Sequence, residues 1–139
     1  MPITQVAPRL MVEDVNRTVA FYNEVLGFAF VRGLAEATRQ PVADWSPTVR
    51  LAYAEVRSGQ AVLAFLSRAA LASELPRLAE ARIGGTAVVG LACDDFDALA
   101  ARLGDILPFI KAPHPSPRGG REMSIEDING YVLTLFDTP

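Results

Sequence analysis

The sequence VAPRLMVEDVNRTVAFYNEVLGF, residues 6–28, contains one strand-like run followed by one helix-like run. Polar and apolar residues alternate with a period of two over 3–12, which is typical of a strand with two different faces. Asp14 then stands where an N-cap is expected, and apolar residues recur at helical spacing until Gly27. The stretch therefore predicts a strand over 3–12 and a helix that begins after Asp14 and ends at Gly27.

Three strand-like runs and a helical segment follow. The runs are FAFVRGLAEATR (28–39), VRLAYAEVRSG (49–59) and AVLAFLSRA (61–69). The turn at Ser58-Gly59 predicts a hairpin between the last two of them. Residues 69–84 are predicted as a linker helix, which Pro76 interrupts.

The pattern then starts again. TAVVGLAC (86–93) predicts a strand, and Asp95, which lies 81 residues after Asp14, predicts the cap of a second helix that Gly104 ends. Asn129-Gly130 predicts a hairpin between the last two of three further strands. These strands are expected at 106–111, 121–127 and 131–137.

This duplication predicts an α+β fold with two tandem β-α-β-β-β modules. The modules span about 1–68 and about 85–139, and with the linker helix of about 69–84 they form a single domain over 1–139. A chain of 139 residues with 50% hydrophobic residues has enough apolar surface for one such core.

Composition and charge exclude several classes of protein. The net charge is −3, whereas nucleic-acid binding needs a basic surface, so no nucleic-acid partner is expected. No run reaches the ~18 apolar residues of a membrane span, and the opening MPITQVAPRLMVED has no basic segment before an apolar core. One cysteine, Cys93, cannot form an intramolecular disulfide. We therefore expect a soluble cytoplasmic protein with no membrane partner.

Residues 6–28 and the closing run GGREMSIEDINGYVLTLFD, residues 119–137, resemble the opening and closing motifs of the glyoxalase / bleomycin-resistance / extradiol-dioxygenase superfamily, also called the vicinal oxygen chelate fold. The resemblance covers nearly the whole chain. It implies that each module curls into a cup, that the resulting mixed sheet surrounds a central groove, and that the protein is a homodimer. Because this fold carries many functions, the resemblance indicates the fold more than the activity.

The same resemblance implies where a metal would bind. Enzymes of the family hold a metal in the groove with His, Gln or Glu from the first and last strands of each module. The matching positions here are Ala7, Leu63 (or Ala64, if the first turn is one residue longer), Val88 and Thr134. Hydrocarbon side chains offer no ligand atom and a neutral hydroxyl is a poor one, so neither a metal nor another cofactor is expected.

The opening without a first-strand histidine resembles the bleomycin-resistance branch, whose members sequester a drug without altering it. Its matching residues are Val6, Pro8, Leu10 and the triplet Gly120-Arg121-Glu122. Gly119 departs from this branch, which often has a tryptophan there, and the lost stacking surface argues against bleomycin itself. The resemblance implies a metal-free binding protein without catalytic residues, for an antibiotic or a planar hydrophobic metabolite.

The candidate ligand-binding residues are Arg9, Trp45, Phe65, Thr86, Glu122, Thr134 and Phe136. Arg9 is notable because a buried guanidinium needs a carboxylate, phosphate or planar polar partner, which is either a ligand or an internal acid such as Glu55 or Glu122. The aromatic residues are core or sheet-edge residues in the alternative interpretation.

An enzyme is the alternative from another functional class. It is either a metal-dependent lyase or dioxygenase with displaced ligands, or a metal-free isomerase that uses Arg9, Glu122 or His114. His114, the only histidine, lies in the proline-rich segment KAPHPSPRGG, which is predicted as a loop able to act as a lid. A dimeric scaffold without a ligand is a third interpretation.

Overall fold

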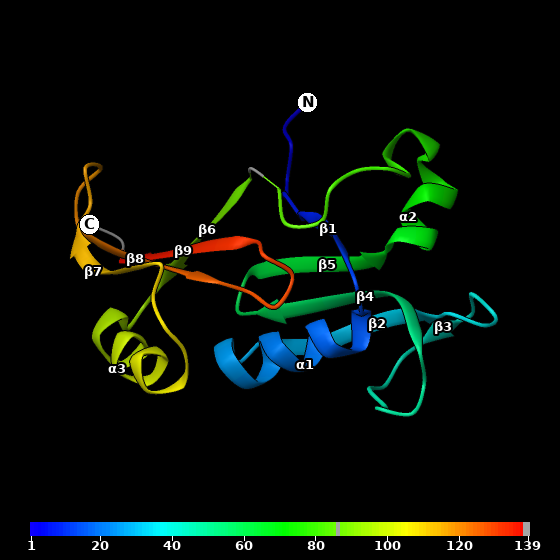
Figure 1. The fold of residues 1–139 in the computed structure, drawn as a ribbon, viewed down its shortest axis with the longest axis horizontal. Coiled ribbons are helices and arrows are strands. Elements are labelled where there is room, and N and C mark those ends of the chain that lie inside the picture. The colour runs from blue at the N-terminus through cyan, green and yellow to red at the C-terminus, as the bar shows by residue number, and fades with distance from the viewer. Residues whose placement is uncertain (86, 138–139) are drawn as a thin grey trace. The chain divides into compact units, whose positions relative to one another are not determined.

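The computed structural model describes residues 1–85 and 87–137. The chain divides into two compact units, Met1–Ile83 and Gly84–Pro139. Each unit contains one mixed sheet with a helix against one of its faces (Figure 1). The boundary falls at the end of the segment that the sequence marks as the linker.

The first unit contains β1 (Arg9–Val12), α1 (Val15–Leu26), β2 (Ala29–Ala35), β3 (Pro41–Val42), β4 (Leu51–Ser58), β5 (Ala61–Ser67), α2 (Arg68–Glu74) and a short 3-10 helix, η1 (Pro76–Leu78). The second unit contains β6 (Val88–Cys93), α3 (Phe96–Ile106), β7 (Lys111–Pro115), β8 (Arg121–Glu126) and β9 (Val132–Asp137).

The two sheets share one topology. The strand order is β1-β5-β4-β2-β3 in the first and β6-β9-β8-β7 in the second. In each, the first strand runs parallel to the last strand of its unit, and the other neighbours are antiparallel. This shared order confirms the α+β fold and the repeated β-α-β-β-β pattern; the two-residue strand β3 was not predicted.

The first helix has the ends that the sequence predicts. The Asp14 side chain accepts a hydrogen bond of 3.0 Å from the backbone N–H of Arg17, which is the N-cap contact. Gly27 follows the last turn with φ of 74°, a left-handed conformation that glycine adopts without a steric penalty.

The second helix begins as predicted but ends later. Asp95 accepts a hydrogen bond of 3.1 Å from Ala98 N–H, whereas Gly104 lies inside α3. The helix stops only before Leu107, which is extended because the following Pro108 disfavours a helical conformation there.

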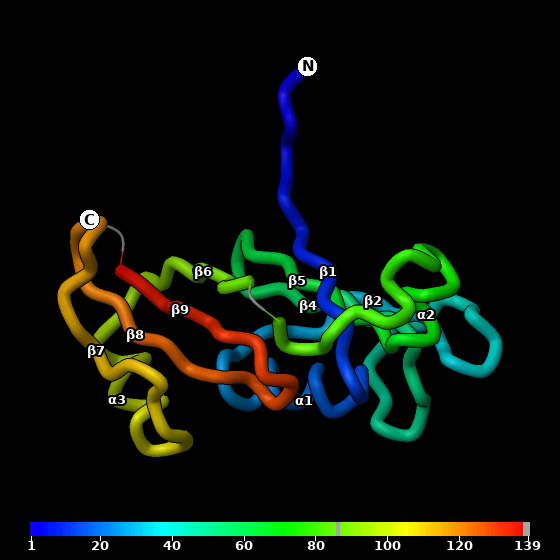
Figure 2. Tube along the Cα trace, turned by 45° about the horizontal axis from the view of Figure 1, so that its top comes forward, coloured from blue at the N-terminus to red at the C-terminus, as the bar shows by residue number. Residues whose placement is uncertain are grey.

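Two other predicted boundaries are wrong for related reasons. The strand expected over 106–111 does not form, and β7 lies instead in the proline-rich segment that was predicted as a loop. Its prolines are tolerated because β7 is the edge strand of its sheet. The first strand starts at Arg9 rather than at residue 3, because Pro8 has no N–H to donate. Residues 1–7 are exposed and extend away from the sheet of the first unit (Figure 2).

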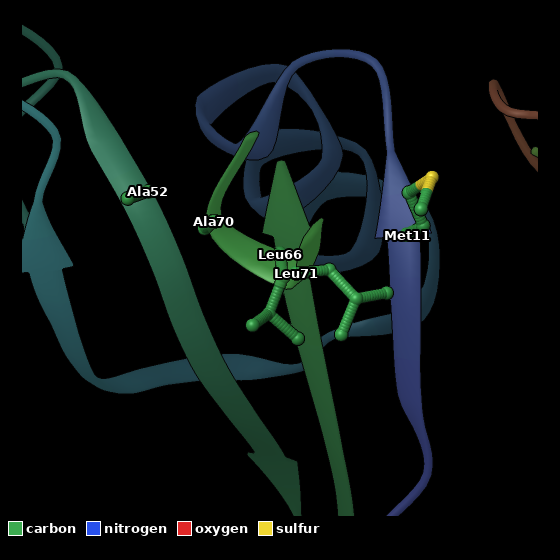
Figure 3. Close-up of a cluster of buried hydrophobic side chains, with 5 residues drawn as sticks. All are labelled: Met11, Ala52, Leu66, Ala70 and Leu71. Atoms are coloured by element: carbon green, nitrogen blue, oxygen red, sulfur yellow. The ribbon is translucent and has the colours of Figure 1, made fainter. Parts of the chain in front are cut away.

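Both faces of the first sheet contribute to its core. On the α1 side, the fully buried rings of Tyr22 and Phe65 lie 4.7 Å apart between centroids. The opposite side holds a second apolar cluster, in which α2 packs over β1, β4 and β5 (Figure 3). Its buried members are Met11, Ala52, Leu66, Ala70 and Leu71.

One buried side chain ties α1 to the segment before β4. Asn16 is only 7% exposed; its Nδ2 donates to the Val49 carbonyl over 2.8 Å, and its Oδ1 accepts from Leu51 N–H over 2.9 Å. Both partners belong to the backbone, so this single amide fixes the loop between β3 and β4 against the helix.

None of the helices in the described part of the chain is long and apolar enough to cross a membrane.

We predict that Asn16→Ala lowers the free energy of unfolding by about 1–3 kcal/mol, because it leaves the buried Leu51 N–H without its acceptor. Urea unfolding measures the change. Asn23→Ala is the matched control: this exposed amide on the same helix makes a single bond, to the Phe28 carbonyl. Equal losses in the two variants would contradict the role assigned to Asn16.

Candidate ligand-binding site

Side-chain alternation on β9 separates a buried face of the second sheet from an open one. Leu133 and Leu135 are buried, and α3 packs against this strand. Val132, Thr134 and Phe136 have the opposite parity and are half-buried. They therefore lie on the face that α3 does not cover.

The strand register brings further residues to this open face. Thr134 lies opposite Gly90 on β6 and Ser124 on β8, and Phe136 lies opposite Glu122. Directly paired residues of neighbouring strands point to the same side of the sheet. The face thus combines an aromatic ring, a carboxylate and two hydroxyl groups.

A cavity of about 500 Å³ lies on this face. Its lining residues are Val88, Gly90, Ser116, Arg118, Gly119, Glu122, Thr134, Phe136 and Asp137. A methyl group added at Gly90 would lie 3.5 Å from the Phe136 ring, so the missing side chain leaves room beside that ring. The lining has an apolar part at Val88 and Phe136 and a polar part at its β8 side.

Glu122 is the centre of the polar part. It is 9% exposed and accepts a 2.9 Å hydrogen bond from Arg118 Nη2, and its other oxygen lies 3.3 Å from His114 Nε2. The Arg118 guanidinium holds the pKa of the Glu122 carboxyl below its usual value of 4.5, against the opposing effect of burial, and His114 adds to the lowering. Glu122 is therefore a fixed anion in the wall of the cavity.

His114 and Thr134 are oriented by contacts of their own. The Nδ1 atom of His114 lies 2.7 Å from the Ala112 carbonyl oxygen, so each of its ring nitrogens lies near an oxygen atom of the protein. The hydroxyl of Thr134 lies 2.8 Å from that of Ser124. The polar groups of the cavity are thus held in place by the protein itself.

Arg118 is a lining residue that the sequence pattern does not predict. Gly119 and Gly120 follow it with φ of 97° and 71°, and Ser116 N–H donates to the Gly120 carbonyl over 2.9 Å. This tight reversal turns the chain back toward β8 and brings Arg118 onto Glu122, four residues later. The Arg-Gly-Gly sequence before the acid was the signal available.

The structure brings together three of the predicted site residues, Glu122, Thr134 and Phe136. The three candidates from the first unit, Arg9, Trp45 and Phe65, do not line this cavity. Phe65 is fully buried against Tyr22, because its parity on β5 places it on the α1 side; it is a core residue and we leave it out of the site. Thr86 lies outside the described residues.

Arg9 is exposed at the start of β1, opposite Ala64 on β5. Neither internal acid proposed for it is its partner in the described residues. Glu55 lies 3.9 Å from Arg32 and accepts from the Tyr53 hydroxyl over 3.3 Å, and Glu122 pairs as described above. Burial, followed by the nearby Glu55 charge, raises the pKa of Tyr53.

Trp45 lies in the loop between β3 and β4, 39% exposed, with its ring 5.7 Å from that of Phe30. It borders a separate cavity with residues of α1. Its position is therefore on the helix side of the first sheet, away from the face that carries Arg9.

The positions that match the family's metal ligands lie together in the second unit but not in the first. Val88 and Thr134 both line the cavity of the second unit. In the first unit the register pairs Arg9 with Ala64, so Ala64 rather than Leu63 shares its face, and Ala7 precedes β1. The described residues contain no group of three or more His, Cys, Asp or Glu side chains placed to hold a metal ion.

Comparison with known proteins gives one family and several similar structures. The model of the Glyoxalase/Bleomycin resistance protein/Dioxygenase superfamily matches residues 3–135. A member of that superfamily from Sphaerobacter thermophilus DSM 20745 is 22% identical with a TM-score of 0.69, and the match covers 98% of each chain. No curated protein matches the chain by sequence.

Two further solved structures are similar throughout. A glyoxalase-related enzyme from Fulvimarina pelagi is 19% identical with a TM-score of 0.70, over 99% of this chain and 90% of that one. A protein of unknown function from Agrobacterium tumefaciens str. C58 is 18% identical with a TM-score of 0.71, over 100% of this chain and 97% of that one. At these identities the likeness concerns the fold.

We predict that Glu122→Gln makes the protein less stable at neutral pH and that its deficit relative to the wild type shrinks in acid. A carboxyl whose pKa is lowered by folding contributes stability above its unfolded value of 4.5, and this contribution is lost as the pH falls through the lowered pKa. Urea unfolding over a pH series measures the deficit. Glu126→Gln, at an exposed position of the same strand, is the control; a Glu122→Gln deficit independent of pH would contradict the assignment.

Proposed function

Because the chain belongs to the Glyoxalase/Bleomycin resistance protein/Dioxygenase superfamily, we propose that it is a metal-free small-molecule binding protein of the bleomycin-resistance-like type. Its ligand, an antibiotic or another planar hydrophobic metabolite, occupies the cavity of the second unit. The observation that carries this proposal is the cavity of about 500 Å³ beside the Phe136 ring. Val88 and Thr134, which stand where enzymes of the family have metal ligands, both line it.

The chemistry of the lining supports binding by apolar contact with a few orienting groups. Pockets for small molecules commonly have volumes of about 300–1,000 Å³, mainly apolar walls and a small number of fixed polar groups. Phe136 offers a ring against which a flat molecule stacks, and the absent side chain of Gly90 leaves space beside it. Arg118, three-quarters exposed at the polar side, orients an acidic or carbonyl group of the ligand.

An enzyme is the second candidate, and one observation favours it. The His114–Glu122 pair, at 3.3 Å, places an imidazole against a carboxylate of the cavity wall. Such a pair is suited to moving a proton to or from a bound substrate. The similar structure from Fulvimarina pelagi is described as a glyoxalase-related enzyme. In this alternative His114 and Glu122 are the acid–base groups of an isomerase, or a metal enters through ligands other than the usual positions.

We predict that Gly90→Val weakens binding of the fluorescent planar anion anilinonaphthalene sulfonate by about tenfold or more, since its added methyl groups fill the space beside Phe136. A β-branched residue suits a strand, so the sheet is expected to form. Ala61→Val, at an exposed position of β5 in the first unit and outside the cavity lining, is the matched control. Equal binding by the two variants would refute this cavity as the site.

We also predict that protein purified without an affinity tag, then incubated with Fe(II), Mn(II), Ni(II) or Zn(II) and dialysed, retains no stoichiometric metal. The reason is that Val88 and Thr134 replace the usual ligands with a hydrocarbon and a neutral hydroxyl. Elemental analysis measures the content, and chelator treatment should leave dye binding unchanged. Stoichiometric metal would favour the enzyme instead.

A further inference from the structure

The first unit has a cavity of its own, which the proposed function does not use. It has a volume of about 310 Å³ and lies between α1, the start of β2 and the loop after β3. Because Phe30 and the α1 residues line it, it opens on the helix side of the first sheet. The face that carries Arg9 and Ala64 is the opposite one.

Two aromatic rings form one wall of this cavity. The rings of Phe30 and Trp45 lie 5.7 Å apart between centroids at an interplanar angle of 54°. Trp45 keeps 39% of its surface exposed, although large apolar side chains are generally buried. An accessible indole face attracts organic cations through its ring quadrupole, and tryptophan is the strongest of the aromatic residues in this respect.

The charged residues of the lining also favour a cationic ligand. Asp44, next to Trp45 in the loop, and Glu24 on α1 both line the cavity, and none of its nine lining residues is basic. Small side chains, Ala20, Ala29 and Ala43, leave the volume between the rings and the carboxylates open. A cation placed there would meet aromatic faces and negative charge together.

The loop that carries Trp45 is held in place before any ligand arrives. Asn16 bonds to both Val49 and Leu51 at its far end, and the hydroxyls of Ser46 and Thr48 lie 3.0 Å apart within it. A preorganised loop spares a ligand the entropic cost of ordering it.

We propose that this cavity is a second binding site, selective for small organic cations such as quaternary or primary ammonium compounds. The site lies wholly within the first unit and uses Trp45, Phe30 and Asp44. It is independent of the cavity beside Phe136, so either proposal can fail without the other.

The single tryptophan gives a direct test, because Trp45 is the source of all tryptophan fluorescence in the chain. We predict a saturable change of this fluorescence with choline and none with dimethylbutanol, its neutral isostere. Gly90→Val should leave the choline titration unchanged, because that variant alters only the second unit. The same response to choline and to the neutral isostere, or no response to choline at millimolar concentrations, would overturn the proposal.

Charge variants sharpen the test. Asp44→Asn should weaken choline binding by about fivefold, the loss expected from removing one nearby charge in water. Glu36→Gln makes the same change of charge at an exposed position of the first unit outside the cavity, and should have no effect. Both sites are exposed, so folding is not at risk. If the two variants weakened choline binding equally, the binding would depend only on the net charge of the protein, and the proposed site would be excluded.

Discussion

In each unit one helix, α1 or α3, packs on one face of the sheet, and this constraint determines on which side the candidate site residues of the strands lie. Side chains of a strand alternate between the faces, so a residue on β5 or β9 either enters the helix-side core or faces away from it. Phe65 belongs to the first group and Phe136 to the second, although both were expected in the same groove. A one-residue difference in register therefore separates a core aromatic residue from one that lines a cavity.

The register differs because the two hairpins differ. In the first unit Ser58 pairs with Ala61 across a two-residue turn, whereas in the second Glu126 pairs with Val132 across five residues. Counting from the hairpin glycine consequently gives the open face in one unit and the core face in the other. Loop length sets the register, and equal spacing in the sequence does not ensure equal placement.

Local signals predicted much of the fold. Asp14 and Gly27 mark the ends of α1, and the caps and hairpins predicted the repeated β-α-β-β-β order of elements, because each of these signals acts over a few residues. The failures depend on longer-range effects. Helix α3 continues past Gly104 and ends only before Leu107, which Pro108 keeps out of the helical conformation. The prolines of β7 are tolerated only because that strand lies at the edge of its sheet. The structure brings the candidate Glu122 together with Thr134 and Phe136, but its partner Arg118 depends on a reversal that the sequence pattern alone does not position.

The two sheets share a topology but differ in what lies on the face opposite their main helix. In the first, α2 covers part of the face opposite α1 and packs an apolar cluster against Met11 and Leu66. Among its described residues, the second unit has a single helix, α3. The face of its sheet that α3 does not cover has a cavity with a fixed carboxylate, Glu122, in its wall. A buried carboxylate is costly without partners, and the Arg118 guanidinium and the His114 ring both contact Glu122. The second unit thus keeps a charged group in the wall of an open cavity, whereas α2 covers part of the corresponding face of the first sheet.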